Sequence, residues 1–296
     1  MLALRSMLVV GGGDVEGLAR ATHSAADAVV IDLASPSLHL ERARVRTEVA
    51  RAVEAIGAAG RVAVARVASA ISGELELDLE ASVGPHLAAV MLGGAEAPQD
   101  ARDADVALRK FEVRHAMTPG AVRLIPEVDS ATGLQALPGI LDAVDRHAAV
   151  ALNAARLHED LGLGHDVQHA HDHAMAQVAI AARAAELPWV LASFDGDRGL
   201  VPATRAHEFG AVGVAVRSDA AARGMNSLFA PEPAAVATAR AVVARWELMH
   251  GRGELVAVTE GGNAGEPVLV DRRTVRRARM LLARAEAIAA RERVRD

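Results

Sequence analysis

Short apolar runs rich in β-branched residues alternate along the chain with longer amphipathic runs. The first kind is typical of buried strands and the second of helices with one buried face. The sequence predicts eight strands, over Ser6–Val10, Ala28–Leu33, Arg61–Val67, Leu87–Leu92, Val122–Val128, Ala148–Leu152, Trp189–Ser193 and Ala211–Val216. Between them it predicts helices over Asp14–Ser24, Leu38–Ala58, Glu74–Val83, Pro98–His115, Thr132–Asp145, Gln168–Glu186 and Thr204–Phe209. This alternation predicts an α/β fold of the (β/α)8 TIM-barrel class.

A doubly wound open sheet is the alternative architecture. The glycine-rich segment Val9-Val10-Gly11-Gly12-Gly13-Asp14-Val15-Glu16-Gly17 lies between a predicted strand and a predicted helix, as a dinucleotide-binding loop would. The third glycine of that fingerprint should fall at position 16, which is glutamate, and an isolated glycine loop is a weak signal. We therefore favour the closed barrel.

The chain continues beyond the eighth unit. We assign residues 1–230 to the barrel and residues 231–296 to a C-terminal extension. That extension contains a helix over Ala234–Met249, a strand-like section over Gly251–Val270 and a basic amphipathic helix over Arg272–Ala289. About 65 residues with so little apolar material would be marginal alone. We expect the extension to pack on the barrel or on a neighbouring subunit.

Composition excludes several chemistries. The 296 residues include no cysteine, which removes disulfides and thiolate chemistry, and no tyrosine. The single lysine, Lys110, lies in a charged stretch typical of a helix surface, which argues against a Schiff-base enzyme. A net charge of −6 without a basic tail argues against nucleic acid or an anionic membrane as partner. No long apolar segment or signal peptide is evident, so we expect a cytoplasmic protein.

Charged residues gather at the predicted carboxyl ends of the strands. In an α/β barrel these ends and the loops after them form the active site. Loop ends are polar everywhere, so each residue alone means little, but the set predicts one mouth. The residues are Asp32, Arg66, Gly93, Gly94, Glu127, Asp129, Asn153, Arg156, Asp195, Asp197 and Arg217.

Motifs along nearly the whole chain give it a family resemblance. Their order and spacing carry the resemblance more than any single piece does. They are Arg5-Ser6-x-Leu8-x-Val10, Val29-Val30-Ile31-Asp32-Leu33, Val64-Ala65-Arg66-Val67, Val128-Asp129-Ser130-Ala131-x-Gly133, Gly199-Leu200, Phe209-Gly210-x-x-Gly213, Ser227-Leu228-Phe229-Ala230-Pro231 and Val270-Asp271-Arg272. The chain resembles the HpcH/HpaI aldolase and citrate lyase β-subunit family, which includes malyl-CoA lyases.

The resemblance implies a mechanism and a set of residues. Enzymes of this family hold a divalent metal, usually Mg²⁺, on two carboxylates after the fifth and sixth strands. An arginine on the third strand, here Arg66, binds and polarises a hydroxy- or oxo-acid, and the reaction passes through a stabilised enolate. Asp271 matches an aspartate of the C-terminal segment that acts as an acid in several members. The family also implies a homo-oligomer, a trimer or hexamer.

The predicted mouth departs from the family pattern at several positions. Asp129 stands where the first metal ligand is usually glutamate. Arg156 stands where the second ligand is usually aspartate, and an arginine cannot coordinate a hard metal. Further departures are Ala34, Ser35, Ala68, Gly93-Gly94 and Val216-Arg217-Ser218.

Two hypotheses about the site remain open. In the first, Arg156 supplies the positive charge instead of a metal and forms an anion clamp with Arg66 and Arg217, and Asp32 is a further candidate substrate-binding residue. In the second, Glu127 and Asp129, two apart on one strand, hold Mg²⁺ alone, with Arg156 weakening its binding. We favour the first.

Two classes of function follow. The protein is either a carbon–carbon lyase acting on a hydroxy- or oxo-acid or its CoA thioester, or a non-catalytic paralogue. The paralogue would bind a dicarboxylate or acyl-CoA anion through Arg66 and Arg156.

A histidine-rich segment offers a separate metal site. His165, His169 and His173 are four apart and would share one face of a helix, which suits zinc or nickel. The segment also reads as a solvent-exposed helix entry, and we favour that interpretation.

Overall fold

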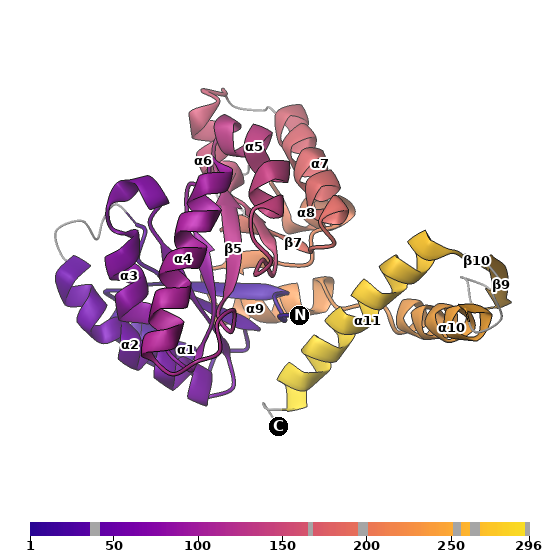
Figure 1. Ribbon diagram of the computed structural model, residues 1–296, viewed down its shortest axis with the longest axis horizontal. Coiled ribbons are helices and arrows are strands. Elements are labelled where there is room, and N and C mark those ends of the chain that lie inside the picture. The colour runs from indigo at the N-terminus through magenta and orange to yellow at the C-terminus, as the bar shows by residue number, and fades with distance from the viewer. Residues whose placement is uncertain (36–41, 165–167, 195–200, 251–255, 261–266, 294–296) are drawn as a thin grey trace. The chain divides into compact units, whose positions relative to one another are not determined.

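The fold is a closed parallel barrel of eight strands. A computed structural model describes all residues except 36–41, 165–167, 195–200, 251–255, 261–266 and 294–296. The strands pair in sequence order, and the last closes on the first (Figure 1). They are β1 (Ser6–Gly11), β2 (Ala28–Asp32), β3 (Val62–Val67), β4 (Leu87–Leu92), β5 (Arg123–Val128), β6 (Val150–Leu152), β7 (Trp189–Phe194) and β8 (Val214–Val216). The predicted (β/α)8 barrel is confirmed, and the open sheet is wrong.

Helices follow the strands around the described barrel. They are α1 (Val15–Ala21), α2 (Arg42–Ala58), α3 (Leu75–Ser82), α4 (Pro98–Arg114), α5 (Ala131–Asp142), α6 (Ala154–Asp160), α7 (Gln168–Ala184), α8 (Ala203–Glu208) and α9 (Asp219–Leu228), with a short 3₁₀ turn η2 (Ala70–Ser72). All seven predicted helices are present with shifted ends, but α6 and α9 were not predicted. The first predicted residues of α2, 38–41, lie outside the described part.

Strand alternation divides the apolar residues into two layers. Leu8, Val29 and Ala65 face outward and belong to the core between barrel and helices. Met7 and Val30, one position away on β1 and β2, and Met91 on β4 are also buried and line the barrel's interior. Because side chains alternate with a period of two, every second residue of a strand points toward the mouth's axis. This arrangement brings chemistry from distant parts of the chain together.

The C-terminal residues form a compact unit of their own. It comprises Met1–Ala3 and Ala230–Asp296, whereas the barrel unit spans Leu4–Phe229. Within it, α10 (Pro233–His250) and α11 (Arg272–Arg293) pack with an antiparallel hairpin of β9 (Ala257–Glu260) and β10 (Pro267–Val270). A small core includes Val242, Met249, Val270 and Val275. The packing of this extension on the barrel or on a neighbour stays a prediction.

None of the described helices combines the length and the apolar composition needed to cross a bilayer.

Candidate active site at the barrel mouth

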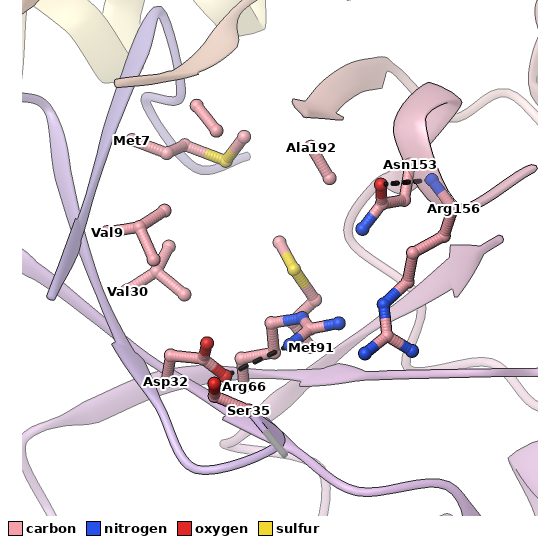
Figure 2. Close-up of a pocket in the computed structure, with 11 residues that line it drawn as sticks. Met7, Val9, Val30, Asp32, Ser35, Arg66, Met91, Asn153, Arg156 and Ala192 are labelled. Carbon is pink, nitrogen blue, oxygen red and sulfur yellow. Dashed lines mark hydrogen bonds and ion pairs between the residues drawn. The ribbon is translucent and has the colours of Figure 1, made fainter. Parts of the chain in front are cut away.

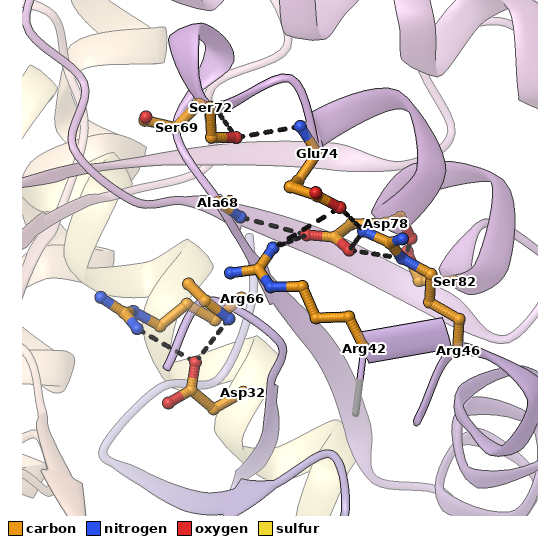
Figure 3. Close-up of polar contacts among 11 residues, drawn as sticks. Asp32, Arg42, Arg46, Arg66, Ala68, Ser69, Ser72, Glu74, Asp78 and Ser82 are labelled. Carbon is orange, nitrogen blue, oxygen red and sulfur yellow. Dashed lines mark hydrogen bonds and ion pairs between the residues drawn. The ribbon is translucent and has the colours of Figure 1, made fainter. Parts of the chain in front are cut away.

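Arg66 is the centre of the polar cluster at the mouth. It ends β3 in register with Asp32 on β2, and its Nη1 donates to Asp32 Oδ1 at 3.0 Å (Figures 2 and 3). Its Nε and Nη2 donate to the two carboxylate oxygens of Glu127 at 2.6 and 3.1 Å. Burial alone would lower the pKa of Arg66, but the two carboxylates outweigh it and the net shift is upward. The guanidinium is therefore permanently charged and already neutralised by its neighbours.

Glu127 is fully buried at the end of β5. Besides the two bonds from Arg66, it accepts a third from the Asn153 side chain at 2.7 Å. Burial favours the neutral acid, yet Arg66 and these hydrogen bonds prevail and lower the pKa of Glu127. Removing one member of a buried, hydrogen-bonded ion pair typically costs about 3–5 kcal/mol. The pair is thus a fixed part of the mouth's wall.

Arg156 reaches the site from the first turn of α6. Asn153 caps this helix, since its side-chain oxygen accepts from the Arg156 backbone N–H at 3.2 Å (Figure 2). The Arg156 side chain remains 44% exposed, and its Nη1 lies 3.4 Å from Asp129 Oδ2. A pair with one partner 44% exposed and a separation of 3.4 Å is weak. Arg156 is therefore available to another anion.

Asp129 lies just beyond β5 and is only 8% exposed. Burial and the nearby charge of Glu127 raise its pKa to about 6, although Arg156 and Arg66 oppose the shift. Asp129 therefore changes charge close to neutral pH.

Glycines bring the loop after β4 close to this cluster. A Cβ at Gly93 would lie 3.1 Å from the Val67 carbonyl oxygen and 3.7 Å from Arg66 Nη2. Gly94 has a φ of +62°, in the left-handed region that favours glycine. This backbone accounts for Gly93-Gly94 at a position where the family usually has other residues.

A second charged cluster supports the loop that follows Arg66. Asp78 on α3 accepts from the Ala68 backbone N–H at 3.4 Å and from Arg46 Nε on α2 at 2.9 Å (Figure 3). Arg46 also pairs with Glu74. Burial raises the pKa of Asp78 despite these arginine contacts. The cluster ties α2 and α3 to the end of β3, and we did not predict it.

The donor set at the mouth does not fit a divalent cation. Both oxygens of Glu127 are taken up by Arg66 and Asn153. Asp129 has a guanidinium beside it where a second carboxylate would be needed. Within the described ranges there is no cluster of three or more histidine, aspartate or glutamate side chains arranged to hold a metal. Magnesium takes carboxylates and water in octahedral geometry, so this geometry disfavours the predicted Glu127–Asp129 metal site.

A cavity of about 180 Å³ opens beside Arg66 and Arg156 (Figure 2). Its polar wall contains Asp32, Ser35, Arg66, Asn153 and Arg156. From the sequence we considered charged residues only and did not predict the apolar wall of the cavity. The strand period of two does place the residues of this wall inward. The apolar residues are Met7, Val9, Val30, Met91, Ala192 and Ala215.

Of the predicted site residues, Glu127 and Asp129 contact Arg66 and Arg156 without lining the cavity, and Arg217 lies elsewhere on the barrel. Arg217 is exposed and lines a different hollow, together with Asp14 and Asp219. Asp271 belongs to the C-terminal unit, where it caps α11: its Oδ1 accepts from the backbone N–H groups of Arg273 and Thr274. These bonds lower the pKa of Asp271. Asp195 and Asp197 lie outside the described residues.

The histidine segment presents a different residue to the core. His169 and His173 are exposed, and His165 lies outside the described part. The buried residue is His171, 4% exposed, whose ring stacks on His158 of α6 with centroids 5.4 Å apart. Periodicity could have identified it, because His171 shares a helix face with the buried Met175 and Val178.

Comparison with known proteins assigns the family. Residues 5–222 match the HpcH/HpaI aldolase/citrate lyase family model, and the chain belongs to this family. A curated relative, (3S)-malyl-CoA thioesterase of Cereibacter sphaeroides, is 25% identical and covers 97% of this chain and 96% of its own. The family predicted from the motifs is therefore confirmed.

Solved structures agree with the fold. The CitE protein of Mycobacterium tuberculosis, in complex with magnesium, acetoacetate and coenzyme A, has a TM-score of 0.61 at 20% identity, covering 96% of this chain and 98% of that one. A malate synthase of Haloferax volcanii, in a ternary complex with pyruvate and acetyl-CoA, has a TM-score of 0.63 at 15% identity, covering 98% and 97%. A citrate lyase from Burkholderia xenovorans has a TM-score of 0.64 at 16% identity, covering 98% and 93%.

Proposed function

We propose that the barrel mouth binds a small hydroxy- or oxo-acid, or its CoA thioester, through Arg156 and without a divalent metal. The observation that carries this proposal is the Arg156 side chain, which extends from α6 beside Asp129 and lines the cavity. A guanidinium matches a carboxylate with two parallel hydrogen bonds. The names and bound ligands of the relatives, a malyl-CoA thioesterase and complexes with acetoacetate, pyruvate and CoA, support this ligand class.

Arg66 has a different part in this proposal. Glu127 and Asp32 engage three of its nitrogens, so it cannot offer a free fork to the ligand. It forms a fixed, charged wall of the cavity and positions the carboxylates around it. Because Arg66→Ala would leave Glu127 buried without its partner, that variant would test folding more than binding.

Arg156 permits a cleaner test. Calorimetric titration in EDTA with malate, oxaloacetate, glyoxylate and acetyl-CoA should show that at least one of these compounds binds to the native protein. Arg156→Ala should lose about 1.5–3 kcal/mol of that binding, the contribution of a charge-assisted hydrogen bond.

The matched control is Arg51→Ala, which removes a 79% exposed arginine on α2. We expect it to bind as the native protein does. Equal binding by the Arg156 variant, or binding only after addition of Mg²⁺, would refute the proposal.

A carbon–carbon lyase is the second candidate function. It is favoured by the position of Arg156 on the cavity wall, where its positive charge would stabilise a developing enolate. The test is chromatographic detection of cleavage products from malyl-CoA and related thioesters in EDTA. Turnover that Arg156→Ala abolishes would establish catalysis, and absence of products despite binding would leave a binding protein.

A further inference from the structure

The charges around the cavity set the charge of its ligand. Three carboxylates lie at the mouth, on Asp32, Glu127 and Asp129, against the guanidinium groups of Arg66 and Arg156. Arg66 already forms ion pairs with two of those carboxylates, on Asp32 and Glu127. Among the described residues that line the cavity, Arg156 alone is a cation with a 44% exposed side chain and one long contact. One such cation matches one carboxylate, and a dianion would add charge to a site already rich in negative groups.

The remainder of the cavity is apolar. Figure 2 shows Met7, Val9 and Val30 across the cavity from Arg156. Met91, Ala192 and Ala215 complete this wall from three other strands. A carboxylate placed against these side chains would lose its hydration without gaining hydrogen bonds, which is costly. An alkyl group placed there would be stabilised by burial instead.

From this division we propose that the ligand is a monocarboxylic oxo- or hydroxy-acid with a short apolar chain, free or as the acyl part of a thioester, and not a dicarboxylate. The carboxylate, or the thioester carbonyl in its place, lies toward Arg156, and the chain lies against Met7, Val9 and Val30. This inference rests on the proposed function and names its substrate class. The cavity's size agrees, since about 180 Å³ is below the roughly 300–1,000 Å³ of pockets for drug-sized ligands.

The size of the side chains on the apolar wall determines how long the ligand's alkyl chain can be. Ala215, 1% exposed in the middle of β8, leaves room that a larger residue would fill. Val9 lies on the same wall and can be shortened to enlarge the space. Ala215→Val, which narrows the cavity, and Val9→Ala, which widens it, should shift the preferred length of the ligand's alkyl chain in opposite directions. If Ala215 and Val9 only stabilised the fold, their substitution would not shift the preferred alkyl-chain length in opposite directions.

The experiment is a titration series on the full-length protein in EDTA. The acids are pyruvate, 2-oxobutyrate and 2-oxovalerate, with oxaloacetate and 2-oxoglutarate as dicarboxylates. We expect each added methylene to tighten binding about fourfold until the cavity is full, from about 0.8 kcal/mol per buried CH₂. Oxaloacetate should bind at least about tenfold more weakly than 2-oxovalerate.

Variants sharpen the test. Ala215→Val should remove the gain from longer chains while pyruvate binding persists, and Val9→Ala should extend the gain to a longer acid. Val106→Ala, which shortens a 68% exposed valine on α4, is the matched control and should change nothing. If Ala215→Val fails to fold, as judged by its Tm, the Val9→Ala result decides.

The outcomes separate the two proposals. A preference for oxaloacetate or 2-oxoglutarate would overturn this inference and leave the proposed function standing. Equal chain-length profiles in the native protein and the cavity variants would also overturn it, because the chain would then lie elsewhere. If neither these acids nor any acid or thioester named above binds, the proposed function fails as well.

Discussion

Single residues at the mouth differ in how tightly their neighbours hold them. Arg66 and Glu127 are locked together by two hydrogen bonds, whereas Arg156 makes one contact at 3.4 Å with Asp129. The charge of Arg66 therefore stabilises the mouth, whereas the charge of Arg156 can bind a ligand. Sequence reasoning identified all four residues as members of one mouth. It could not assign their pairs, because Arg66 and Glu127 are 61 positions apart and several pairings are equally compatible with strand ends.

Asp129 leads to a prediction about pH and stability. Its pKa in the folded protein is raised from 3.8 to about 6, so the native state binds a proton more firmly than the unfolded state. Stability is therefore lost as pH rises from about 4 to about 6. Asp129→Asn removes the charge that causes this loss. At pH 8 we expect the variant to be about 1–3 kcal/mol more stable than the native protein, and at pH 4 equally stable.

Urea unfolding at the two pH values measures this difference. Val106→Ala, at a 68% exposed position on α4, changes no titratable group and is the control, so its difference in stability from the native protein should be the same at both pH values. A variant less stable than the native protein at pH 8 would contradict the assigned cause, since the contact with Arg156 would then outweigh burial.

At the scale of elements, strands were more predictable than short helices. Each strand is a run of β-branched and small apolar residues buried on both faces, which yields a strong pattern. Helix α6 has seven residues and depends on its Asn153 cap, so it offers too few turns for a periodic signal. Yet α6 carries Arg156, and the site's geometry follows from that helix.

Helices α6 and α7 meet at the stacked pair His158 and His171. Burial is the main cause that lowers the pKa of His171, followed by the charge of His158, while Asp172 opposes them. The unfolded chain therefore takes up a proton first, and stability is lost as pH falls through about 6.5. His171→Leu should remove part of that loss, so its Tm should fall less between pH 8 and pH 5 than the native Tm.

The exposed histidines of α7 carry a separate prediction. His169→Ala with His173→Ala should leave fold, assembly and ligand binding unchanged. Elemental analysis of the untagged protein adds a second criterion. A stoichiometric transition metal that these alanine variants lose would contradict the surface interpretation of His169 and His173.

At the scale of the whole molecule, the C-terminal unit leaves apolar side chains open. Leu248, Val256, Val258 and Leu269 are each more than half exposed. Apolar groups gathered in one unit favour burial against a partner. We predict a homo-oligomer, a trimer or hexamer, so light scattering during gel filtration should give three or six times the chain mass of 30.8 kDa. A mass equal to one chain would contradict this prediction and the expected packing of the extension on a neighbouring subunit.

The central claim is that Arg156 replaces a metal at the mouth, and one titration series tests it most directly. Native protein and Arg156→Asp are titrated with Mg²⁺, with and without oxaloacetate, and with each acid in EDTA. The substitution removes the cation and restores a second carboxylate beside Asp129. We predict weak Mg²⁺ binding to the native protein and tighter binding to the variant. Metal-free acid binding should fall by about 1.5–3 kcal/mol, or roughly one to two decades in Kd. Stoichiometric micromolar Mg²⁺ binding to the native protein, or an Arg156→Asp variant unchanged toward both metal and acid, would contradict the account.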